Sequence, residues 1–438
     1  MSFGRTRKNL QGRLSIARNR TRLLCDNDDF KMKKLTIGVF TDSFPPTIDG
    51  VANATENYAK IIQQKYGEAV VAAPYYPAVR DNYSFKVIRY PSAHIGNNIG
   101  YRAGYPFDPQ ILYDLERRNI DIIHAHSPFV SAVLARMLRS RTGAPIVFTY
   151  HTKFDIELKK AVANNTLRRA SVKFIVNNIN ACDEVWAVSE GAGQNLCGLG
   201  YKGKYTVVEN GTDFERRKPD PNRVDKLKSE FEIPCDATVF LYVGRMRWYK
   251  GIKLSLDGLR AAKAKGEKFR FVVVGDGIDS DEIKEYSKQA GLEKECIFAG
   301  CVHDRERLRD LYAMSDVFLF PSAFDANGIV VREAAACGVP SVLIKNSSAS
   351  EGIDDTVGIL IDDTVEAMRD AVLFACTKKE QVRALGGNAS QKIYKSWDQS
   401  VAKAYGRYKK IIDSHINKRN DNIMAETAFN DAIERLIF

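Results

Sequence analysis

The chain has 438 residues, of which 45% are hydrophobic and 27% charged, and its formal net charge is +11. This length allows two or three domains with full cores, and no run of about 18 apolar residues is long enough to cross a bilayer. The N-terminus lacks the apolar stretch of a signal peptide, so we expect a cytoplasmic protein. The eight cysteines are scattered without a C-x-x-C pair, which argues against a disulfide framework or a zinc site.

Much of the positive charge lies in an N-terminal arm. Its first 34 residues hold ten Lys or Arg and three Asp. Such an arm could contact anionic lipid or nucleic acid. We favour a plainer interpretation, a disordered extension ahead of Met32, and expect no nucleic-acid partner because the rest of the chain is only mildly basic.

From Lys34 onward, short β-branched stretches alternate with amphipathic helical segments such as residues 51–67. This alternation predicts βαβ units and a parallel sheet with helices on both faces. The predicted strands of the first half are residues 34–40, 69–75, 120–126, 145–151, 183–189 and 205–211.

A polar stretch with two prolines, residues 210–222, interrupts the pattern, which then starts again. The predicted strands of the second half are residues 238–244, 269–275, 296–300, 316–322, 341–345 and 358–362. A helix from Trp397 to about Ile412 and a polar tail follow. We therefore expect an α/β chain of two doubly wound domains, with an N-terminal extension (1–32), a first domain (33–212), a second domain (213–396) and a C-terminal helix and tail (397–438).

Ligands of open parallel sheets bind at the carboxyl ends of the strands, so motifs at those ends carry the most weight. Gly50 follows the first predicted strand at the start of a helix, where it would let backbone amides approach an anion. In the second domain, Arg245 and Lys250 follow the strand 238–244. Two fixed cations there suit a diphosphate, and the alternative is a solvated basic loop.

The segment "FDANGIVVREAAACGVP" places Glu333 within a stretch of small and branched apolar residues. A carboxylate on a helix face suited to burial needs a polar partner. We expect Glu333 to accept hydrogen bonds from the ribose hydroxyls of a nucleotide. The amides near Asn327 and Gly328 would face the diphosphate, and Asp325 would hold a sugar's hydroxyls.

These motifs carry a family resemblance over about residues 33–413. "GRMRWYKG", "LYAMSDVFLFPS" and the D-x7-E pattern that runs into "REAAACGVPSV" resemble the second domain of family-4 retaining glycosyltransferases. "FTDSFPPTIDGVAN", "HAHSPF" and "FTYHTKFD" resemble their first domain. The combination is most similar to the branch that glycosylates membrane lipids such as diacylglycerol or phosphatidylinositol.

The resemblance implies a GT-B fold, two Rossmann-like domains facing a cleft, and a nucleotide-sugar donor of the UDP-glucose or GDP-mannose type. It assigns the diphosphate to Arg245, Lys250 and Gly50 and the ribose to Glu333. It assigns the donor sugar to Asp325, the first carboxylate of the D-x7-E pattern. It also places His126 beside the anomeric carbon. One position departs from the family: Asp325 stands where the usual motif has glutamate.

Neither a metal nor a cofactor other than the donor is implied. Asp155 is a weaker candidate for a covalent nucleophile, and His151 for a second functional histidine. "DSD" at residues 279–281 resembles a metal-binding triplet, but a helix cap is the favoured interpretation.

Several alternatives stay open at this point. The acceptor is a lipid, or a soluble sugar or polysaccharide; a GT-B protein that binds without turnover is a further alternative. The basic amphipathic segment 154–176 is a candidate for contact with an anionic membrane surface, which would make the enzyme peripheral. An exposed charged helix face explains the same pattern equally well.

Overall fold

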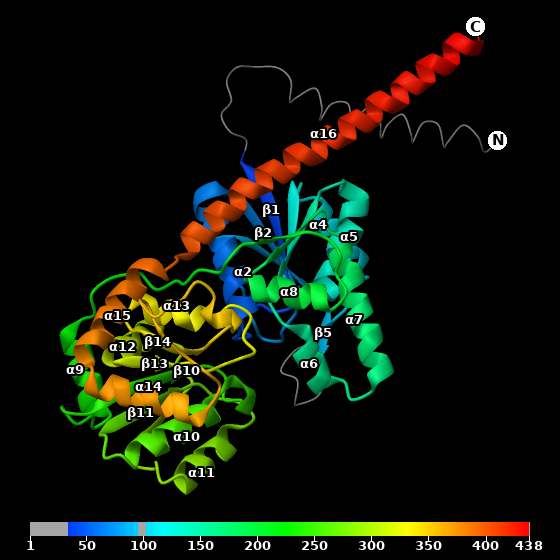
Figure 1. Cartoon of the computed structure of the whole chain (residues 1–438). Helices are drawn as coiled ribbons and strands as arrows, with labels where there is room; N and C mark the ends of the chain where they lie inside the picture. Colours follow the sequence, from blue (N-terminus) through cyan, green and yellow to red (C-terminus); the bar gives the residue numbers. More distant parts are fainter. Residues whose placement is uncertain (1–33, 95–101, 438) are drawn as a thin grey trace. The chain divides into compact units, whose positions relative to one another are not determined.

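The computed structural model describes residues 34–94 and 102–437, so the basic arm over residues 1–32 lies outside the described residues. The chain forms two parallel sheets flanked by helices, as the sequence predicts (Figure 1). We call the part built on the first sheet the N-terminal lobe and the part built on the second the C-terminal lobe. The predicted limits at residues 212 and 396 stay predictions, although each sheet lies within one predicted domain.

The sheet of the N-terminal lobe has seven strands in the order β3-β2-β1-β6-β7-β8-β9. All six predicted strands are present, and the sequence analysis missed the edge strand β3 and a short antiparallel pair, β4 and β5. The strands are β1 (Leu35–Phe40), β2 (Gly67–Pro74), β3 (Lys86–Tyr90), β4 (Ser92–His94), β5 (Arg102–Gly104), β6 (Ile122–Ala125), β7 (Ile146–Tyr150), β8 (Glu184–Ala187) and β9 (Tyr205–Val207).

Helices of this lobe begin where the sequence supplies N-caps. The side chains of Asp49, Asn164 and Ser189 each accept hydrogen bonds from the first backbone N–H groups of the helix that follows. The helices are α2 (Gly50–Ile61), continued by η1 (Ile62–Tyr66), then α4 (Pro109–Glu116), α5 (Val130–Thr142), α6 (Phe154–Ala161), α7 (Asn165–Asn180) and α8 (Glu190–Gly198).

The sheet of the C-terminal lobe has six strands in the order β12-β11-β10-β13-β14-β15. All six were predicted. They are β10 (Thr238–Val243), β11 (Phe269–Val274), β12 (Cys296–Gly300), β13 (Val317–Leu319), β14 (Ser341–Ile344) and β15 (Ile359–Ile361). Their nearly continuous apolar sequences fit strands that are buried on both faces.

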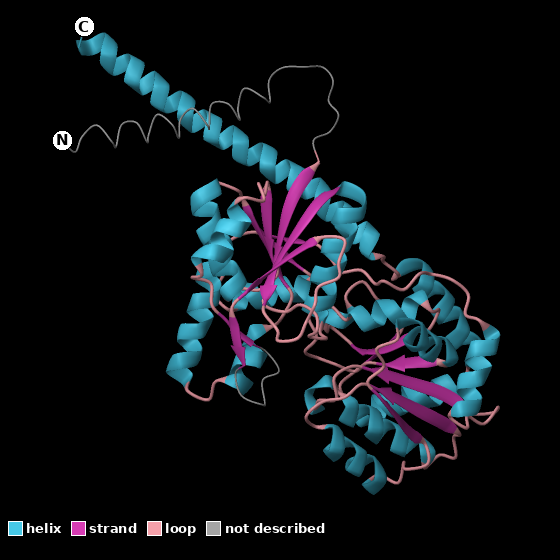
Figure 2. Ribbon diagram, turned by 180° about the vertical axis from the view of Figure 1, so that it is seen from behind, coloured by secondary structure: helices cyan, strands magenta, loops and turns pink. Residues whose placement is uncertain are grey.

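Helices cover both faces of this second sheet (Figure 2). One apolar cluster packs α10 (Ile252–Lys263), α11 (Ser280–Gln289) and α14 (Val365–Thr377) against the strands. The other packs α9 (Pro221–Glu230), α12 (Arg305–Met314) and α13 (Ile329–Ala336). The remaining elements are α15 (Lys379–Lys392) and the turns η2 (Trp248–Lys250) and η3 (Ser348–Ser350).

The C-terminal helix α16 runs from Trp397 to Ile437, so the predicted end near Ile412 is wrong. No glycine or proline follows Gly406, so residues 407–438 include neither of the two residue types that most disfavour a helix. The helix returns to the N-terminal lobe, where Tyr408 stacks on Trp186 with ring centroids 5.5 Å apart. Within the described part of the chain, no helix combines the length and apolar character that a membrane span requires.

Candidate active site

Neighbouring strands bring the predicted residues of the N-terminal lobe together. β1, β6 and β7 lie side by side in the sheet, and the segments that follow their carboxyl ends carry Gly50, His126 and His151. His126 directly follows β6, where its backbone N–H donates to the carbonyl of Phe40 at 2.8 Å. His151 directly follows β7.

His126 and His151 form a hydrogen-bonded pair, with His126 Nδ1 2.9 Å from His151 Nε2. Their other ring nitrogens, His126 Nε2 and His151 Nδ1, are buried and have no hydrogen-bond partner among the described residues. A neutral imidazole carries one N–H, so one of these two atoms is a donor and the other an acceptor. The pair therefore offers one donor and one acceptor to a bound ligand.

Burial keeps these histidines neutral. Loss of solvent lowers the pKa of His151 to about 3, and it also lowers the pKa of His126 well below the ordinary value. A third histidine, His124, packs against His126 with ring centroids 3.9 Å apart. Neutral rings can bind hydroxyl groups, and they do not act as proton donors of the imidazolium type near pH 7.

Gly50 is the first residue of α2 and lies near α13 of the other lobe. A Cβ atom built there would meet only Ile329 Cδ1, at 3.8 Å, so neither the backbone nor the described neighbours require glycine. The nearby N–H groups of Val51 and Ala52 already donate to Asp49 Oδ1 at 2.8 Å. The first helical turn is therefore less available to an anion than the sequence predicts.

The C-terminal lobe joins Lys250 and Asp325 directly. Lys250 Nζ lies 2.6 Å from Asp325 Oδ2, and the two side chains are 15% and 20% exposed. Gly251 fixes the chain here with φ 81°, and a Cβ atom at that position would overlap the carbonyl oxygen of Pro321. Arg245 is exposed on the same loop. The loop thus places Lys250 against one carboxylate and exposes a second cation, Arg245.

Asn327 and Gly328 lie between Asp325 and helix α13. Gly328 caps the helix in the left-handed conformation, with φ 59°. Asn327 is buried, and its Nδ2 donates to the carbonyl of Val188 in the N-terminal lobe at 2.5 Å. Its Oδ1 has no partner among the described residues. Asn327 therefore links the lobes and keeps one acceptor for a ligand.

Glu333 is 3% exposed, and its carboxylate has the polar partners that a buried carboxylate needs. Its Oε1 accepts a hydrogen bond from Arg305 Nη2 at 2.6 Å, and its Oε2 accepts one from the Tyr312 hydroxyl at 3.0 Å. Burial and the Glu333 carboxylate raise the pKa of Tyr312 well above its usual range. Arg305 also pairs with Asp213. Glu333 is thus held as a paired carboxylate with lone pairs left for a hydroxyl ligand.

The side chains of the two weaker candidates, Asp155 and Asp279, bind protein groups. Asp155 Oδ1 accepts a hydrogen bond from Asn195 Nδ2 at 2.9 Å, at the start of α6. Asp279 stands at the N-cap of α11, but its side chain accepts from the backbone of Trp248 at 2.9 Å instead of capping its own helix.

The sequence analysis missed three residues of this region: Arg305, Tyr312 and His124. Arg305 and Tyr312 lie on α12, whose charged sequence resembles an ordinary surface helix. A buried Glu333 needs polar partners, and this need could have identified them. Helices α12 and α13 lie directly before and after β13, so they were the natural place to look. His124 stands two residues before His126, so the alternation of a strand puts both rings on one face.

Sequence models of two protein families match the chain. The model described as Glycosyltransferase Family 4 matches residues 48–216, and the model described as Glycosyl transferases group 1 matches residues 224–392. The first match covers most of the N-terminal lobe, and the second covers most of the C-terminal lobe.

Curated relatives match over most of their length. Alpha-monoglucosyldiacylglycerol synthase of Streptococcus pneumoniae is 24% identical over 413 residues, which are 92% of this chain and 91% of the relative. The GDP-mannose-dependent alpha-(1-6)-phosphatidylinositol dimannoside mannosyltransferase of Mycobacterium tuberculosis is 26% identical over 319 residues, 72% of this chain and 80% of the relative.

Solved structures share the fold. HepE of Anabaena, in complex with UDP and glucose, has a TM-score of 0.67 at 19% identity and covers 87% of this chain with 100% of its own. Sucrose-phosphate synthase of Thermosynechococcus elongatus has a TM-score of 0.70 at 17% identity with the same coverage. The chain therefore has the GT-B fold predicted from its sequence, and it is a hexosyltransferase whose two halves match the models of glycosyltransferase family 4 and of the group 1 glycosyl transferases.

Proposed function

We propose that this hexosyltransferase moves a hexose from a nucleotide sugar to a hydroxyl group of a membrane lipid, with retention of configuration. The observation that carries the proposal is the ion pair of Lys250 and Asp325, 2.6 Å apart. A cation for phosphate and a carboxylate for sugar hydroxyls stand there side by side. Glu333 lies eight residues further on, where it is buried but keeps free lone pairs.

Each part of the nucleotide sugar has a partner in this proposal. Arg245 and Lys250 bind the diphosphate, Glu333 accepts hydrogen bonds from the ribose, and Asp325 holds the hexose. The unpartnered Nε2 of His126 and Oδ1 of Asn327 supply further polar contacts. Asp325 keeps a carboxylate where the family has glutamate, and Lys250 holds that carboxylate in place. The proposal requires no metal and no cofactor other than the donor.

The transfer proceeds on one face of the sugar. The bond between the anomeric carbon and the phosphate oxygen breaks, and the acceptor oxygen bonds to that carbon on the same face. The acceptor's proton passes to the leaving phosphate oxygen, so no separate base is needed. Arg245 and Lys250 stabilise the charge that develops on the diphosphate, which is typically worth about 3 kcal/mol for each preorganised donor.

The proposed acceptor follows from the relatives, whose names specify diacylglycerol and phosphatidylinositol products. We place the enzyme at the cytoplasmic surface of a membrane as a peripheral protein. The basic segment 154–176 would contact anionic lipid there, adding about 1 kcal/mol for each cation near the surface.

Thermal unfolding with a panel of UDP and GDP sugars tests the donor site. A donor present at about one hundred times its Kd raises the free energy of unfolding by about 2.7 kcal/mol. We expect one nucleotide class to stabilise the protein. A transfer assay with that donor and short-chain diacylglycerol or phosphatidylinositol then identifies the acceptor.

Lys250→Met should abolish both the stabilisation and the transfer. Lys253→Met is the matched control, because Lys253 lies three residues away, is exposed and pairs with Asp257, which keeps Arg260 as a second cationic partner. Stabilisation that survives Lys250→Met would refute the site. A folded protein that no nucleotide sugar stabilises would point to a binding protein without turnover.

A further inference from the structure

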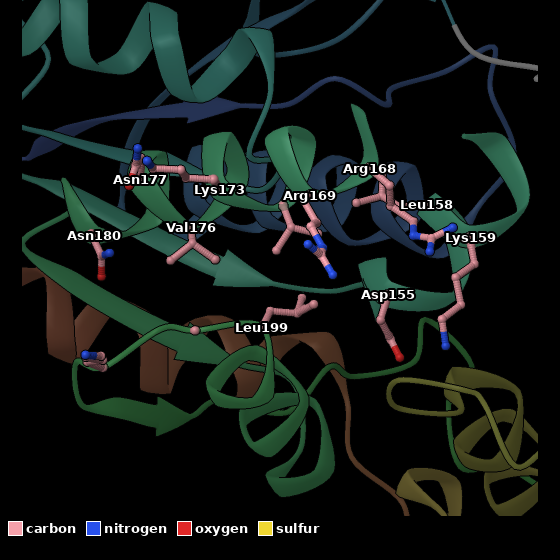
Figure 3. Close-up of a pocket in the computed structure, with 13 residues that line it drawn as sticks. Asp155, Leu158, Lys159, Arg168, Arg169, Lys173, Val176, Asn177, Asn180 and Leu199 are labelled. Atoms are coloured by element: carbon pink, nitrogen blue, oxygen red, sulfur yellow. The ribbon is translucent and has the colours of Figure 1, made fainter. Parts of the chain in front are cut away.

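A cavity of about 630 Å³ lies in the N-terminal lobe among α6, α7 and the loop that joins α8 to β9 (Figure 3). Its volume is typical of small-molecule sites, which range from about 300 to 1,000 Å³. None of the residues assigned above to the donor lines it. The cavity therefore needs an explanation of its own.

Positive charge dominates the lining. Among the lining residues whose side chains the structure describes, Asp155 is the one carboxylate, and its Oδ1 already accepts a hydrogen bond from Asn195. Figure 3 shows the Arg169 side chain extending from α7 into the space between Leu199 and Asp155. Five cations line the cavity, and none forms an ion pair with another residue whose side chain the structure describes: Lys159, Arg168, Arg169, Lys173 and Lys202.

The rest of the lining is mostly apolar. Leu158 and Val176 are buried, and Val172 and Leu199 are half-buried. The same helix α7 exposes Leu167 and Phe174, which are 59% and 46% exposed. They are seven residues apart, about two helical turns, and so lie on one side of the helix. Cations beside apolar surface form a site for a ligand that is both anionic and apolar.

We propose that this cavity binds the phosphate group of one anionic membrane phospholipid. Arg168 and Arg169 would hold the phosphate oxygens with charge-assisted hydrogen bonds, and Lys173 would add charge. The glycerol and the first methylene groups would lie against Val172, Val176 and Leu199. Leu167 and Phe174 would enter the bilayer interface beside it. The inference rests on the proposed function, because that function places the enzyme at a membrane.

Charge complementarity favours a phospholipid over other occupants. A neutral diacylglycerol would leave the charge of the five cations uncompensated, although Arg168 donates a hydrogen bond to Asn165 Oδ1. A nucleic acid follows a cationic stripe along a surface and stacks bases on aromatic rings. Here the cations surround one cavity whose apolar lining is aliphatic, and its described lining residues include no aromatic side chain.

Titration calorimetry of the full chain tests the site directly. We expect saturable binding of dihexanoyl phosphatidate and much weaker binding of dihexanoyl phosphatidylcholine. Arg169→Gln combined with Lys173→Gln should weaken phosphatidate binding at least about tenfold, since charge-assisted hydrogen bonds are lost. Both side chains are exposed, so the fold should survive.

Lys86→Gln combined with Arg118→Gln is the matched control, because it removes the same charge from exposed positions outside the cavity. An equal loss in this control would show diffuse attraction and overturn the site. Inorganic phosphate that binds as tightly as phosphatidate would assign the cavity to free phosphate. Displacement of the phosphatidate by an oligonucleotide would assign it to nucleic acid.

A transfer assay with dihexanoylglycerol separates this inference from the proposed function. The cavity variant should keep its turnover of this dissolved acceptor and lose its preference for vesicles that contain phosphatidylglycerol. A wild-type protein that binds phosphatidate but transfers no sugar would contradict the proposed function alone. Transfer without phosphatidate binding would contradict the cavity alone.

Discussion

Glu333 is the residue on which the donor site depends most. Its carboxylate is buried, and the Arg305 guanidinium and the Tyr312 hydroxyl hold it in place. Arg305 keeps a second carboxylate partner, Asp213, so the removal of the charge on Glu333 does not leave a cation alone. A substitution at this position should therefore change donor binding more than it changes the fold.

Glu333→Gln should raise the KM for the donor at least about tenfold, because a hydrogen bond to a charged group is worth about 1.5–3 kcal/mol. Steady-state kinetics at varied donor concentration measures this. Glu306→Gln is the control, since Glu306 is exposed and pairs with Arg217 and Arg223, neither of which is assigned to the site. An unchanged KM in Glu333→Gln would show that the ribose does not bind this carboxylate.

The buried histidines predict how stability depends on pH. Burial lowers the pKa of His151 to about 3, while in the unfolded chain a histidine titrates near 6.5. Between these values the unfolded chain binds a proton that the folded chain does not. The free energy of unfolding should therefore fall as the pH drops below about 6.5, by up to about 1.4 kcal/mol per pH unit for each such histidine.

Urea unfolding at several pH values between neutrality and mild acid measures this slope. His151→Gln should make the slope smaller, because one buried titrating group is removed. His94→Gln should leave it unchanged, because His94 is exposed. Equal slopes in the wild type and His151→Gln would show that other groups cause the acid sensitivity.

At the scale of the element, α16 is the helix that ties the end of the chain to the first sheet. The Tyr408 hydroxyl lies 2.6 Å from His124 Nδ1, and His124 Nε2 lies 2.7 Å from the hydroxyl of Thr149. His124 packs beside His126, so the C-terminal helix supports the wall of the candidate active site.

Tyr408→Phe should lower the free energy of unfolding by about 1–3 kcal/mol, because it leaves a buried ring nitrogen without a partner. Tyr405→Phe on the same helix should cost less, since that hydroxyl makes a longer hydrogen bond of 3.3 Å to the carbonyl of Tyr66. Chemical denaturation compares the two variants. Equal losses would mean that the bond to His124 adds nothing to the helix packing.

The sequence predicted every strand inside the two main sheets and also the edge strands β9, β12 and β15, but it missed the edge strand β3 and the short pair β4 and β5. Interior strands are continuous apolar runs, whereas β3 alternates and β4 and β5 have three residues each, too few to show a period. The length of α16 was underestimated because its polar residues suggested a tail, although no glycine or proline ends the helix.

For the candidate site, the sequence identified the groups that would face the ligand and not those that hold them. Asp325 and Lys250 were predicted separately, and their ion pair depends on how two loops meet. Arg305 lies 28 positions before Glu333, and a contact at that separation depends on how α12 and α13 pack, which periodicity does not specify.

At the scale of the whole molecule, hydrogen bonds between side chains and backbone groups join the two lobes beside the site. Glu351 accepts hydrogen bonds from the N–H groups of Glu190 and Gly191, at 2.7 and 2.6 Å, and so binds the N-terminus of α8. The Ser189 hydroxyl donates to the carbonyl of Ala326 at 2.6 Å, one residue after Asp325. The position of the sugar-binding carboxylate is therefore coupled to the N-terminal lobe.

Gly191→Ala tests this coupling. A Cβ atom at this position would clash with Ser348 Oγ and lie 2.8 Å from Glu351 Oε1, so the side chains that join the lobes here must shift. We expect kcat/KM to fall at least about tenfold, because small misplacements of catalytic groups are costly, with little change in the unfolding of either lobe. Gly198→Ala in the same helix is the control, because a Cβ atom there meets nothing within 4 Å. Since the two variants make the same chemical change in one helix, equal activities would show that catalysis does not depend on this contact.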